Sequence, residues 1–335
     1  MTMRNAATLP MTVHVEVEKW PLTVPFHITG YTLVAIDVVV VSLRRDGALG
    51  RGEAAGVYYR GDDVPRMVKQ IEAVRESIER GIDGESLRQL LPAGGARNAV
   101  DCALWDLEAK FSGRPAWENA GLARPQPLLT TFTCGADEPE KMAAAAVGYT
   151  NACAIKLKLT GDPADADRVR AVRDARADVW LSVDANQGFT RDFLERLMPV
   201  LVETNVSLIE QPFAIGQEAL LDGLGSPIPI AADESVQGLA DIAALVGRFD
   251  VINIKLDKCG GLTEGLAMVR AARELGIESM VGNMSGTSLA MAPAFLVGQL
   301  CKVVDLDGPV FLEKDRPIAV EYTDGYIMCS RSLWG

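Results

Sequence analysis

Histidine and basic runs are the scarcest features of this 335-residue chain. Only His14 and His27 occur, both near the N-terminus. Later segments therefore cannot supply the histidine of a Ser-His hydrolase or of a histidine-based zinc site. The 33 Lys and Arg residues are outnumbered by 45 Asp and Glu residues, which gives a formal charge of −12 with no basic block. This balance argues against nucleic acid or an anionic membrane as a partner.

Three further absences narrow the fold and the location. The six cysteines show no CxxC spacing and most lie among apolar residues, which favours buried free thiols over disulfides or a zinc site. The first ten residues lack the apolar core of a signal peptide, and no run approaches about 18 apolar residues. We therefore expect a soluble, cytoplasmic protein. No segment reads GxGxxG, which weighs against the main alternative fold, a doubly wound open sheet that binds a dinucleotide.

The chain divides into two patterns of secondary structure. Residues 1–125 predict an α+β domain, with strands at 14–20, 32–45 and 51–56 and helices near 63–80, 84–91 and 95–112. From Pro127, apolar runs alternate with amphipathic segments, and the candidate strands lie near 128–134, 152–158, 178–184, 206–211, 228–233, 251–256, 278–283 and 302–306. Together with the intervening helices they predict a (β/α)7β TIM-like barrel over residues 126–315, within an α/β protein. Residues 316–335 are expected to return to the first domain.

Three of the candidate strands are followed by a carboxylate. Asp184 closes WLSVDAN, Glu210 closes VSLIEQP, and Asp233 follows in PIAADES. Because the C-terminal ends of parallel strands meet at one mouth of a barrel, these side chains should converge. Adjoining carboxylates raise one another's pKa unless a cation neutralises them, and an all-oxygen set suits Mg²⁺ or Mn²⁺. The alternative is that each carboxylate only caps the helix that follows.

Lysines end two other candidate strands. Lys156 and Lys158 lie two residues apart in AIKLKL, so their side chains share one face of a strand. Inside a barrel, each ammonium group should lower the pKa of the other from about 10.4 toward the ~7–8 of a useful general base. Lys255, in VINIKLDK, ends the sixth strand, across the barrel from the second. A metal between opposed lysines suits a 1,1-proton transfer: one lysine removes the proton α to a carboxylate, the metal stabilises the enediolate, and the other lysine returns a proton.

The ordered motifs resemble those of the enolase superfamily, in its muconate-lactonizing enzyme subgroup, and especially the dipeptide epimerases of the L-Ala-D/L-Glu type. The resemblance spans nearly the whole chain and includes ARNAVDCALWDLEAK, which is similar to the family's capping-domain helix. It implies that residues 1–125 form a capping domain. It also implies two catalytic acid/bases, Lys158 and Lys255, with Lys156 as their electrostatic neighbour.

The same resemblance assigns a metal site and a substrate site. The family's Mg²⁺ ligands fall on Asp184, Glu210 and Asp233. Dipeptide epimerases carry DxD at strand eight, where this chain has Asp305-Leu306-Asp307. Two carboxylates on one strand face make a site for a free α-ammonium group, which N-acylated amino acids lack. A turn before Gly308-Pro309 would explain Asp307 but not Asp305. The predicted substrate-binding set is Asp305, Asp307, Thr133 and Tyr31.

One departure from the family concerns the second residue of the dipeptide. Family members that act on Ala-Glu carry an arginine in the first capping loop, and this arginine holds the Glu side chain of the substrate. Here no Arg or Lys occurs between Lys19 and Arg44, which leaves His27, Tyr31 or Arg60 as substitutes. A buried carboxylate without a cation is unfavourable. We therefore expect a second residue with an uncharged side chain.

The leading hypothesis is a Mg²⁺-dependent epimerase that inverts the α-carbon of the C-terminal residue of a small dipeptide. The same lysines and metal would also serve an N-acylamino acid racemase, an o-succinylbenzoate synthase or a cycloisomerase, but Asp305 and Asp307 weigh against these because their substrates carry no ammonium group. A non-catalytic binder of amino acids or peptides is a third hypothesis, although binding alone needs no opposed bases such as Lys158 and Lys255. The resemblance also allows a homo-oligomer.

Overall fold

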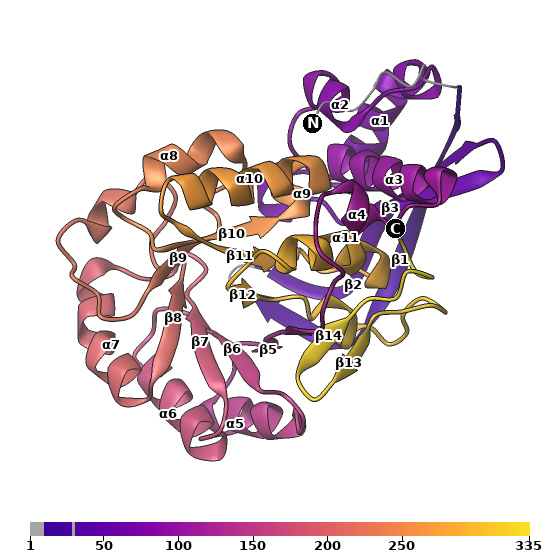
Figure 1. The fold of residues 1–335 in the computed structure, drawn as a ribbon. Helices are drawn as coiled ribbons and strands as arrows, with labels where there is room; N and C mark the ends of the chain where they lie inside the picture. Colours follow the sequence, from indigo (N-terminus) through magenta and orange to yellow (C-terminus); the bar gives the residue numbers. More distant parts are fainter. Residues whose placement is uncertain (1–9, 29–30) are drawn as a thin grey trace.

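Three sheets organise the chain. The structure is a computed structural model that describes residues 10–28 and 31–335, with the side chains of 26–28 and 31 excepted. Within these ranges, a three-stranded antiparallel sheet belongs to the cap, an eight-stranded parallel sheet forms the barrel, and a small three-stranded sheet joins the C-terminal segment to the start of the barrel region. In Figure 1 the cap, indigo to purple, lies beside the barrel, and the C-terminus lies next to the cap.

The cap sheet separates two apolar cores. Its strands run in the order β1-β2-β3, and their bounds are β1 Thr12–Ile28, β2 Tyr31–Arg45 and β3 Ala48–Ala54. Successive side chains of a strand point to opposite faces. Val39 and Val41 accordingly pack with the cap helices, whereas Val38 and Val40 belong to the larger cluster that includes the barrel core. All four valines are buried, which fixes the sheet against both neighbours.

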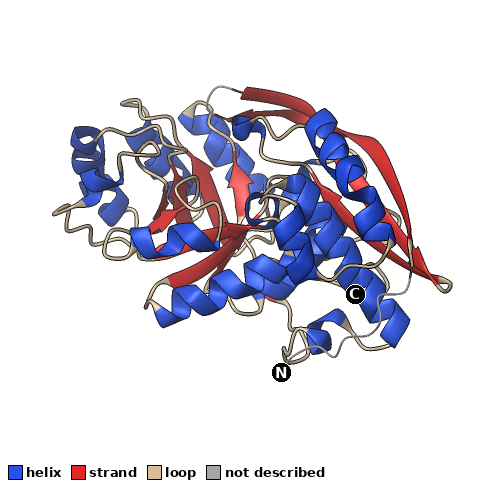
Figure 2. Cartoon of the chain, turned by 90° about the horizontal axis from the view of Figure 1, so that it is seen from above, coloured by secondary structure: helices blue, strands red, loops and turns tan. Residues whose placement is uncertain are grey.

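The cap helices pack on this sheet, and α3 also contacts α9 and α10 of the barrel. The bounds of the cap helices are η1 Tyr58–Arg60, α1 Val64–Glu79, α2 Gly84–Leu90, α3 Gly95–Ser112 and α4 Ala116–Asn119. Helix α3 crosses β3 so closely that a Cβ added at Gly50 or Gly52 would lie 2.3 Å from the Ala103 carbonyl oxygen or 2.2 Å from that of Ala99. Figure 2 shows the long cap strands along one side of the molecule, with helices between them and the barrel strands.

The predicted parallel barrel is confirmed. Its strands are hydrogen-bonded in sequence order, and their bounds are β5 Phe132–Cys134, β6 Ala154–Lys158, β7 Trp180–Asp184, β8 Val206–Glu210, β9 Ile230–Ala232, β10 Val251–Lys255, β11 Glu278–Gly282 and β12 Val303–Val304. The register pairs Lys158 with Asp184 and Asp184 with Glu210, so these charged residues at the C-terminal strand ends lie side by side on neighbouring strands. A backbone hydrogen bond of 3.0 Å from Thr131 N to Val304 O joins the first strand region to the last.

The outer helices are fewer than the seven regular helices that the sequence predicts. The described helical segments of the barrel are α5 Pro139–Gly148, α6 Asp165–Ala175, α7 Arg191–Glu203, η2 Glu218–Leu221, η3 Leu239–Asp241, α8 Ile242–Leu245, α9 Leu256–Cys259, α10 Leu262–Glu274, α11 Ser288–Gly298 and η4 Gly308–Phe311. Between β8 and β9 only the 3-10 turn η2 forms, because FAIGQEALLDGLGSPIP places Gly216 before a short apolar segment and glycines and prolines after it. The predicted helix GLADIAALVGR shortens to η3 and α8, and it is bracketed by Gly238 and Gly247.

The candidate strand at 128–134 forms two strands in different sheets. Residues Leu128–Leu129 form β4, which pairs with β14 (Tyr326–Met328), and β14 pairs with β13 (Glu321–Thr323). The final residues also contact the cap: Gly335 N donates to Asp106 Oδ1 at 2.7 Å. All six cysteines are free thiols, as predicted, but only three of them are buried, namely Cys102, Cys134 and Cys259; Cys153 is exposed, and Cys301 and Cys329 are partly exposed. No helix in the described ranges is long and apolar enough to span a membrane.

Buried polar contacts join the cap to the barrel. On α3, Arg97 Nη2 donates to Glu264 Oε2 on α10 at 2.6 Å. On the cap segment after β3, Gly56 N donates to Asp257 Oδ1 at 2.8 Å. Asp257 belongs to α9, the single turn that follows Lys255 at the end of β10. It therefore ties the loop that contains residues 55–61 to a strand end of the barrel.

Asp257 gives a pH-dependent prediction for stability. Burial raises the pKa of Asp257 to about 7, with the nearby Asp62 and Glu53 acting in the same direction. In the unfolded chain an aspartate has a pKa of about 3.9. The folded state therefore keeps a proton that the unfolded state loses, and the contribution of Asp257 to the free energy of unfolding falls as the pH rises from about 4 to 7. Asp257→Asn stays uncharged and should avoid this loss.

We expect the Tm of Asp257→Asn, relative to wild type, to rise by about 2–4 °C between pH 5 and pH 8, because the proton retained by the folded state over this range corresponds to roughly 2–3 kcal/mol. Thermal unfolding followed by circular dichroism at both pH values measures this change. Asp167→Asn, at an exposed carboxylate of α6, is the control and should show the same Tm difference from wild type at both pH values. An equal response of the two variants would contradict the prediction.

Candidate active site

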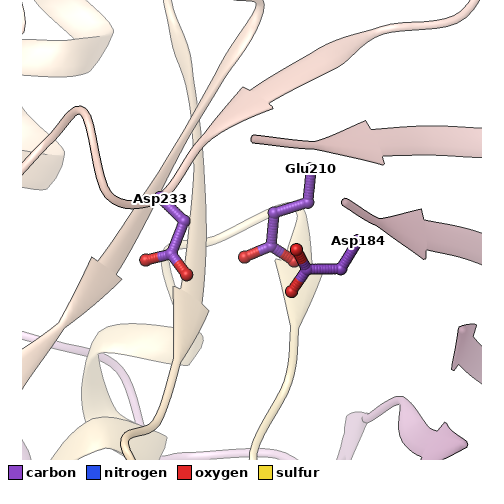
Figure 3. A group of neighbouring side chains, drawn as sticks. All are labelled: Asp184, Glu210 and Asp233. Atoms are coloured by element: carbon purple, nitrogen blue, oxygen red, sulfur yellow. The ribbon is translucent and has the colours of Figure 1, made fainter. Parts of the chain in front are cut away.

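Three carboxylates converge at the C-terminal ends of neighbouring barrel strands. Asp184 ends β7, Glu210 ends β8, and Asp233 directly follows β9. One oxygen from each lies within 4.8 Å of the others, and all three residues are buried, as Figure 3 shows for their relative placement. Burial, reinforced by the charge of Asp184, raises the pKa of Glu210 to about 8. The convergence predicted from the strand ends is confirmed.

The donor set of this triad fits a divalent cation. Asn253 Nδ2 donates to Glu210 Oε1 at 2.7 Å. Among the described residues nothing donates a hydrogen bond to Glu210 Oε2, and the nearest cation, Lys156 Nζ, lies 3.7 Å away. A buried oxygen of this kind, beside two further carboxylates, is a ligand that Mg²⁺ prefers. Asp184, Glu210 and Asp233 are therefore the residues that would hold Mg²⁺.

Two lysines approach the triad from opposite sides of the barrel. Lys158 ends β6 and Lys255 ends β10, the second and sixth of the eight barrel strands. Lys158 Nζ donates to Asp184 Oδ2 at 2.5 Å, and Lys255 Nζ donates to Asp233 Oδ2 at 2.6 Å. The three carboxylates therefore lie between two ammonium groups. A molecule bound at the triad would meet one lysine on each face.

The expected lowering of the Lys156 pKa by Lys158 is wrong. Burial does lower the pKa of Lys156, but the carboxylates of Asp305, Glu210 and Asp184 outweigh burial and raise it above its ordinary value. Lys156 Nζ donates a short hydrogen bond to Asp305 Oδ2. The sequence argument considered the neighbouring lysine on the same strand. It did not include the carboxylate that strand eight brings to this position.

Asp305 and Asp307 follow β12 at the same end of the barrel. Asp305 accepts hydrogen bonds from Lys156 and, at 2.6 Å, from Thr131 Oγ1. Asp307 Oδ2 accepts a 2.8 Å hydrogen bond from the backbone N of Thr133. Burial, together with the charge of Asp305, raises the pKa of Asp307 to about 6. Asp305, Asp307 and Thr133 all line one cavity with Lys156, Lys158 and Lys255.

This cavity opens between the barrel mouth and the cap. Its lining includes the charged residues described above and a set of apolar and aromatic residues, which we call the outer wall: Leu33, Tyr58 and Tyr59 from the cap and Met284 and Phe311 from barrel loops. Four further polar residues complete the lining: Asn186, Glu234, Asn283 and Ser285. Among the described residues, the cations that line the cavity are the three lysines described above.

The substitutes considered for a capping-loop arginine do not supply a described cation. Arg60 is exposed, and its Nη1 donates to Gln237 Oε1 at 3.0 Å. The side chains of Tyr31 and His27 lie outside the described residues, so the predicted role of Tyr31 stays a prediction. A substrate side chain that reaches the outer wall would meet mainly apolar surface.

Two polar residues at the triad were missed by the sequence analysis. Lys258 is buried, and its Nζ donates to Asp233 Oδ1 and to the Asp233 carbonyl oxygen, each at 2.5 Å. Although burial alone would raise the pKa of Asp233, the ammonium groups of Lys255 and Lys258 lower it. Asn253, which donates to Glu210, lies two residues before Lys255 on β10. Strand alternation could have identified Asn253, because it places both side chains on one face.

Comparisons with known families cover nearly all of the chain. Residues 10–121 match the family described as "Mandelate racemase / muconate lactonizing enzyme, N-terminal domain". Residues 140–331 match the family described as "Enolase C-terminal domain-like". The two matches correspond to the cap and to the greater part of the barrel.

Individual relatives cover the chain at similar length. The L-Ala-D/L-Glu epimerase of Escherichia coli strain K12 is 37% identical over 316 residues, which are 94% of this chain and 98% of the relative. An Agrobacterium tumefaciens enolase family member with homology to dipeptide epimerases was crystallised with sodium and L-Ala-L-Glu; it is 40% identical, with a TM-score of 0.94 over 97% of this chain and 100% of that one. The dipeptide epimerase of Methylococcus capsulatus, solved with Mg and L-Arg-D-Lys, is 32% identical. Its TM-score is 0.90, over 96% of this chain and 98% of that one. The bound dipeptides differ in their second residue.

Proposed function

This chain belongs to the enolase superfamily, in its mandelate racemase and muconate lactonizing enzyme branch, and on that premise we propose that it inverts the α-carbon of the C-terminal residue of a dipeptide by a two-lysine proton transfer. It is an isomerase, a dipeptide epimerase. The proposal for its mechanism rests on one observation: Lys158 and Lys255 stand on opposite sides of the carboxylate triad.

The geometry divides the work between the two lysines. When bound at the triad, Mg²⁺ supplies positive charge next to the substrate carboxylate, which makes the adjacent α-proton removable. The neutral amine of one lysine takes this proton from one face of the α-carbon. The ammonium group of the other lysine gives a proton to the opposite face, and the configuration is inverted. Lys158 and Lys255 exchange roles in the reverse direction.

The second residue of the dipeptide should be uncharged. Its side chain extends from the α-carbon between the lysines toward the outer wall of the cavity, where Leu33, Tyr58 and Phe311 lie. Burying a carboxylate against this wall would leave it without a cation among the described residues, which is unfavourable. The two relatives that act on or bind Ala-Glu show that the family accommodates such a substrate. Our proposal for this chain rests on its own cavity wall.

Pooled dipeptides in D₂O test the reaction and the specificity together. We would incubate the Mg²⁺-loaded protein with pools of L,L-dipeptides and N-acylated amino acids and read mass shifts. The proposal predicts a gain of one mass unit in dipeptides with an apolar C-terminal residue, with slower exchange in Ala-Glu. Exchange confined to N-acylated amino acids would instead support a racemase of that class.

Leu33→Arg should move the specificity toward an acidic second residue. The new guanidinium group would offer a cation on the outer wall, and a hydrogen bond between charged groups contributes about 1.5–3 kcal/mol. We expect the ratio of kcat/KM for L-Ala-L-Glu to that for L-Ala-L-Leu to rise by roughly 10-fold or more. Leu33→Met keeps the wall apolar and should leave this ratio within about threefold of wild type. An unchanged ratio in Leu33→Arg would show that the side chain of the second residue does not approach position 33.

A further inference from the structure

The loop at residues 283–287, between β11 and α11, contributes three residues to the cavity, and we call it the cavity loop. These residues are Asn283, Met284 and Ser285. Ser285 has a φ of 76°, a left-handed conformation that is unfavourable for a residue with a Cβ and persists only where the surroundings hold it. Contacts beyond Ser285 itself must therefore stabilise the cavity loop.

Two anchors fix the ends of the cavity loop. At its start, Asn283 Oδ1 accepts from Ser285 N at 2.8 Å, and Asn283 Nδ2 donates to the Asp305 carbonyl oxygen at 2.8 Å. At its end, Thr287 N donates to Glu53 Oε1 at 2.7 Å, and Thr287 Oγ1 donates a short hydrogen bond to Glu53 Oε2. The first anchor belongs to the barrel, whereas the second comes from β3 of the cap.

Glu53 is buried as part of an ion pair. It is 1% exposed, and its Oε2 accepts from Arg316 Nη2 at 2.6 Å. Arg316 in turn donates to Glu18 Oε2 of β1 at 2.7 Å. The carboxylate lies so close to the cavity loop that a Cβ added at Gly286 would be 3.0 Å from Glu53 Oε1. The cap sheet, the C-terminal segment and the cavity loop therefore meet at one buried carboxylate.

We propose that Glu53 is a positioning residue that holds the cavity loop in the conformation that binds substrate. This inference rests on the proposed function, since it assumes a dipeptide in the cavity. Glu53 itself is not among the residues that line the cavity. The lysines and carboxylates that surround the α-carbon lie at the ends of β6 to β10, whereas the cavity loop follows β11. A displaced loop should therefore weaken substrate binding more than it slows the proton transfer.

Glu53→Gln tests the proposal with little change in the shape of the side chain. The amide can still accept one hydrogen bond from Thr287, but it offers no negative charge to Arg316. For the Mg²⁺-loaded protein with L-Ala-L-Leu, we expect KM to rise by about 10- to 100-fold, the value of a hydrogen bond to a charged group. The kcat should stay within about threefold of wild type.

Asp101→Asn is the matched control, at another buried carboxylate that joins the cap to the barrel. Asp101 accepts hydrogen bonds from Thr263 N at 2.9 Å and from Thr263 Oγ1 at 2.6 Å, at the start of α10. The variant should lower the Tm but keep KM within about threefold of wild type, because the residues of α10 are not among those that line the cavity. An unchanged KM in a folded Glu53→Gln protein would overturn the proposal.

Hydrogen exchange of the cavity loop gives a readout that needs no turnover. In peptides that span residues 283–287, measured by mass spectrometry, the backbone amides of Glu53→Gln should exchange at least about tenfold faster than those of wild type. Asp101→Asn should match wild type, and equal exchange in the two variants would overturn the proposal. A wild-type protein that epimerises no dipeptide would instead overturn the proposed function, and loop exchange would then decide whether Glu53 holds the loop.

Thr287→Val removes the same contact from the barrel side and replaces Glu53→Gln if that variant does not fold. It should raise KM by about tenfold, whereas Thr287→Ser keeps the hydroxyl donor and should keep KM within about threefold of wild type. Thr287 also caps α11 by accepting from Leu289 N. Ser288→Ala, which removes a hydroxyl that donates to Asp315 at the same helix start, controls for loosening of this helix. An equal rise of KM in Thr287→Val and Ser288→Ala would overturn the proposal.

Discussion

Lys158→Met and Lys255→Met should each lower kcat for dipeptide epimerisation by roughly 10²–10⁴-fold, the usual contribution of a general acid or base. Each variant keeps one lysine and therefore lacks either the base or the acid for a given direction of reaction. Methionine preserves the length and the apolar stem of the side chain in these buried positions. Rates from optical rotation or chiral chromatography, together with deuterium uptake in D₂O, measure the loss.

The matched control for these variants is Lys302→Met, at an exposed lysine just before β12. It should retain the rate within about twofold, because its side chain is not among those that line the cavity. Circular dichroism and thermal unfolding show whether the buried variants remain folded. Unchanged α-proton exchange in a folded Lys158→Met protein would contradict the two-lysine mechanism.

Glu210→Gln should weaken Mg²⁺ binding by at least about 100-fold. The substitution keeps the shape of the side chain and removes one of three converging negative charges. It also converts the carboxylate into an amide, although Glu210 Oε2 accepts no hydrogen bond from the described residues and is available to a cation. Loss of residues that only support metal ligands costs 10- to 100-fold in affinity, so loss of a ligand should cost at least as much. Isothermal titration with Mg²⁺ measures the affinity directly.

Thermal unfolding gives a second readout that does not depend on turnover. A cation bound at 100 times its Kd stabilises the folded state by about 2.7 kcal/mol. The wild-type Tm should therefore rise on addition of Mg²⁺, whereas the Tm of Glu210→Gln should not. Glu234→Gln is a sharp control, because Glu234 is a buried carboxylate next to Asp233 but outside the triad. It should weaken Mg²⁺ binding less than tenfold, and equal losses in the two variants would contradict the assignment of ligands.

The sequence predicted the barrel and the metal triad correctly because the same pattern, an apolar run followed by a charged residue, recurs at successive strands. Asp184, Glu210 and Asp233 each follow an apolar run, and parallel strands bring such ends together whatever their detailed register. This is why the metal triad and the barrel could be predicted from the order of residues alone. The helices predicted after β8 and β9 are not regular, because glycine and proline after β8 and glycine alone after β9 shorten these crossings to 3-10 or single-turn segments.

Contacts between distant segments explain what the sequence could not reveal. Lys156 and Asp305 are 149 residues apart; Lys156 lies on β6 and Asp305 follows β12, which is not a neighbour of β6 in the barrel, so local pattern cannot show that they pair. The direction of the Lys156 pKa depended on that pair. Lys258 reaches Asp233 from the turn after β10, and nothing in KLDKCGG indicates where its side chain points. Only the folded chain reveals these partners.

The position of a deuterium label within the dipeptide tests the central claim most directly. We would incubate the Mg²⁺-loaded protein with L-Ala-L-Leu in D₂O and locate the label by tandem mass spectrometry. The account predicts one deuterium on the α-carbon of the C-terminal residue, with L-Ala-D-Leu appearing at the same time, and no label after chelation of the metal. Label on the N-terminal residue, or no label in any dipeptide while Mg²⁺ binds normally, would contradict it.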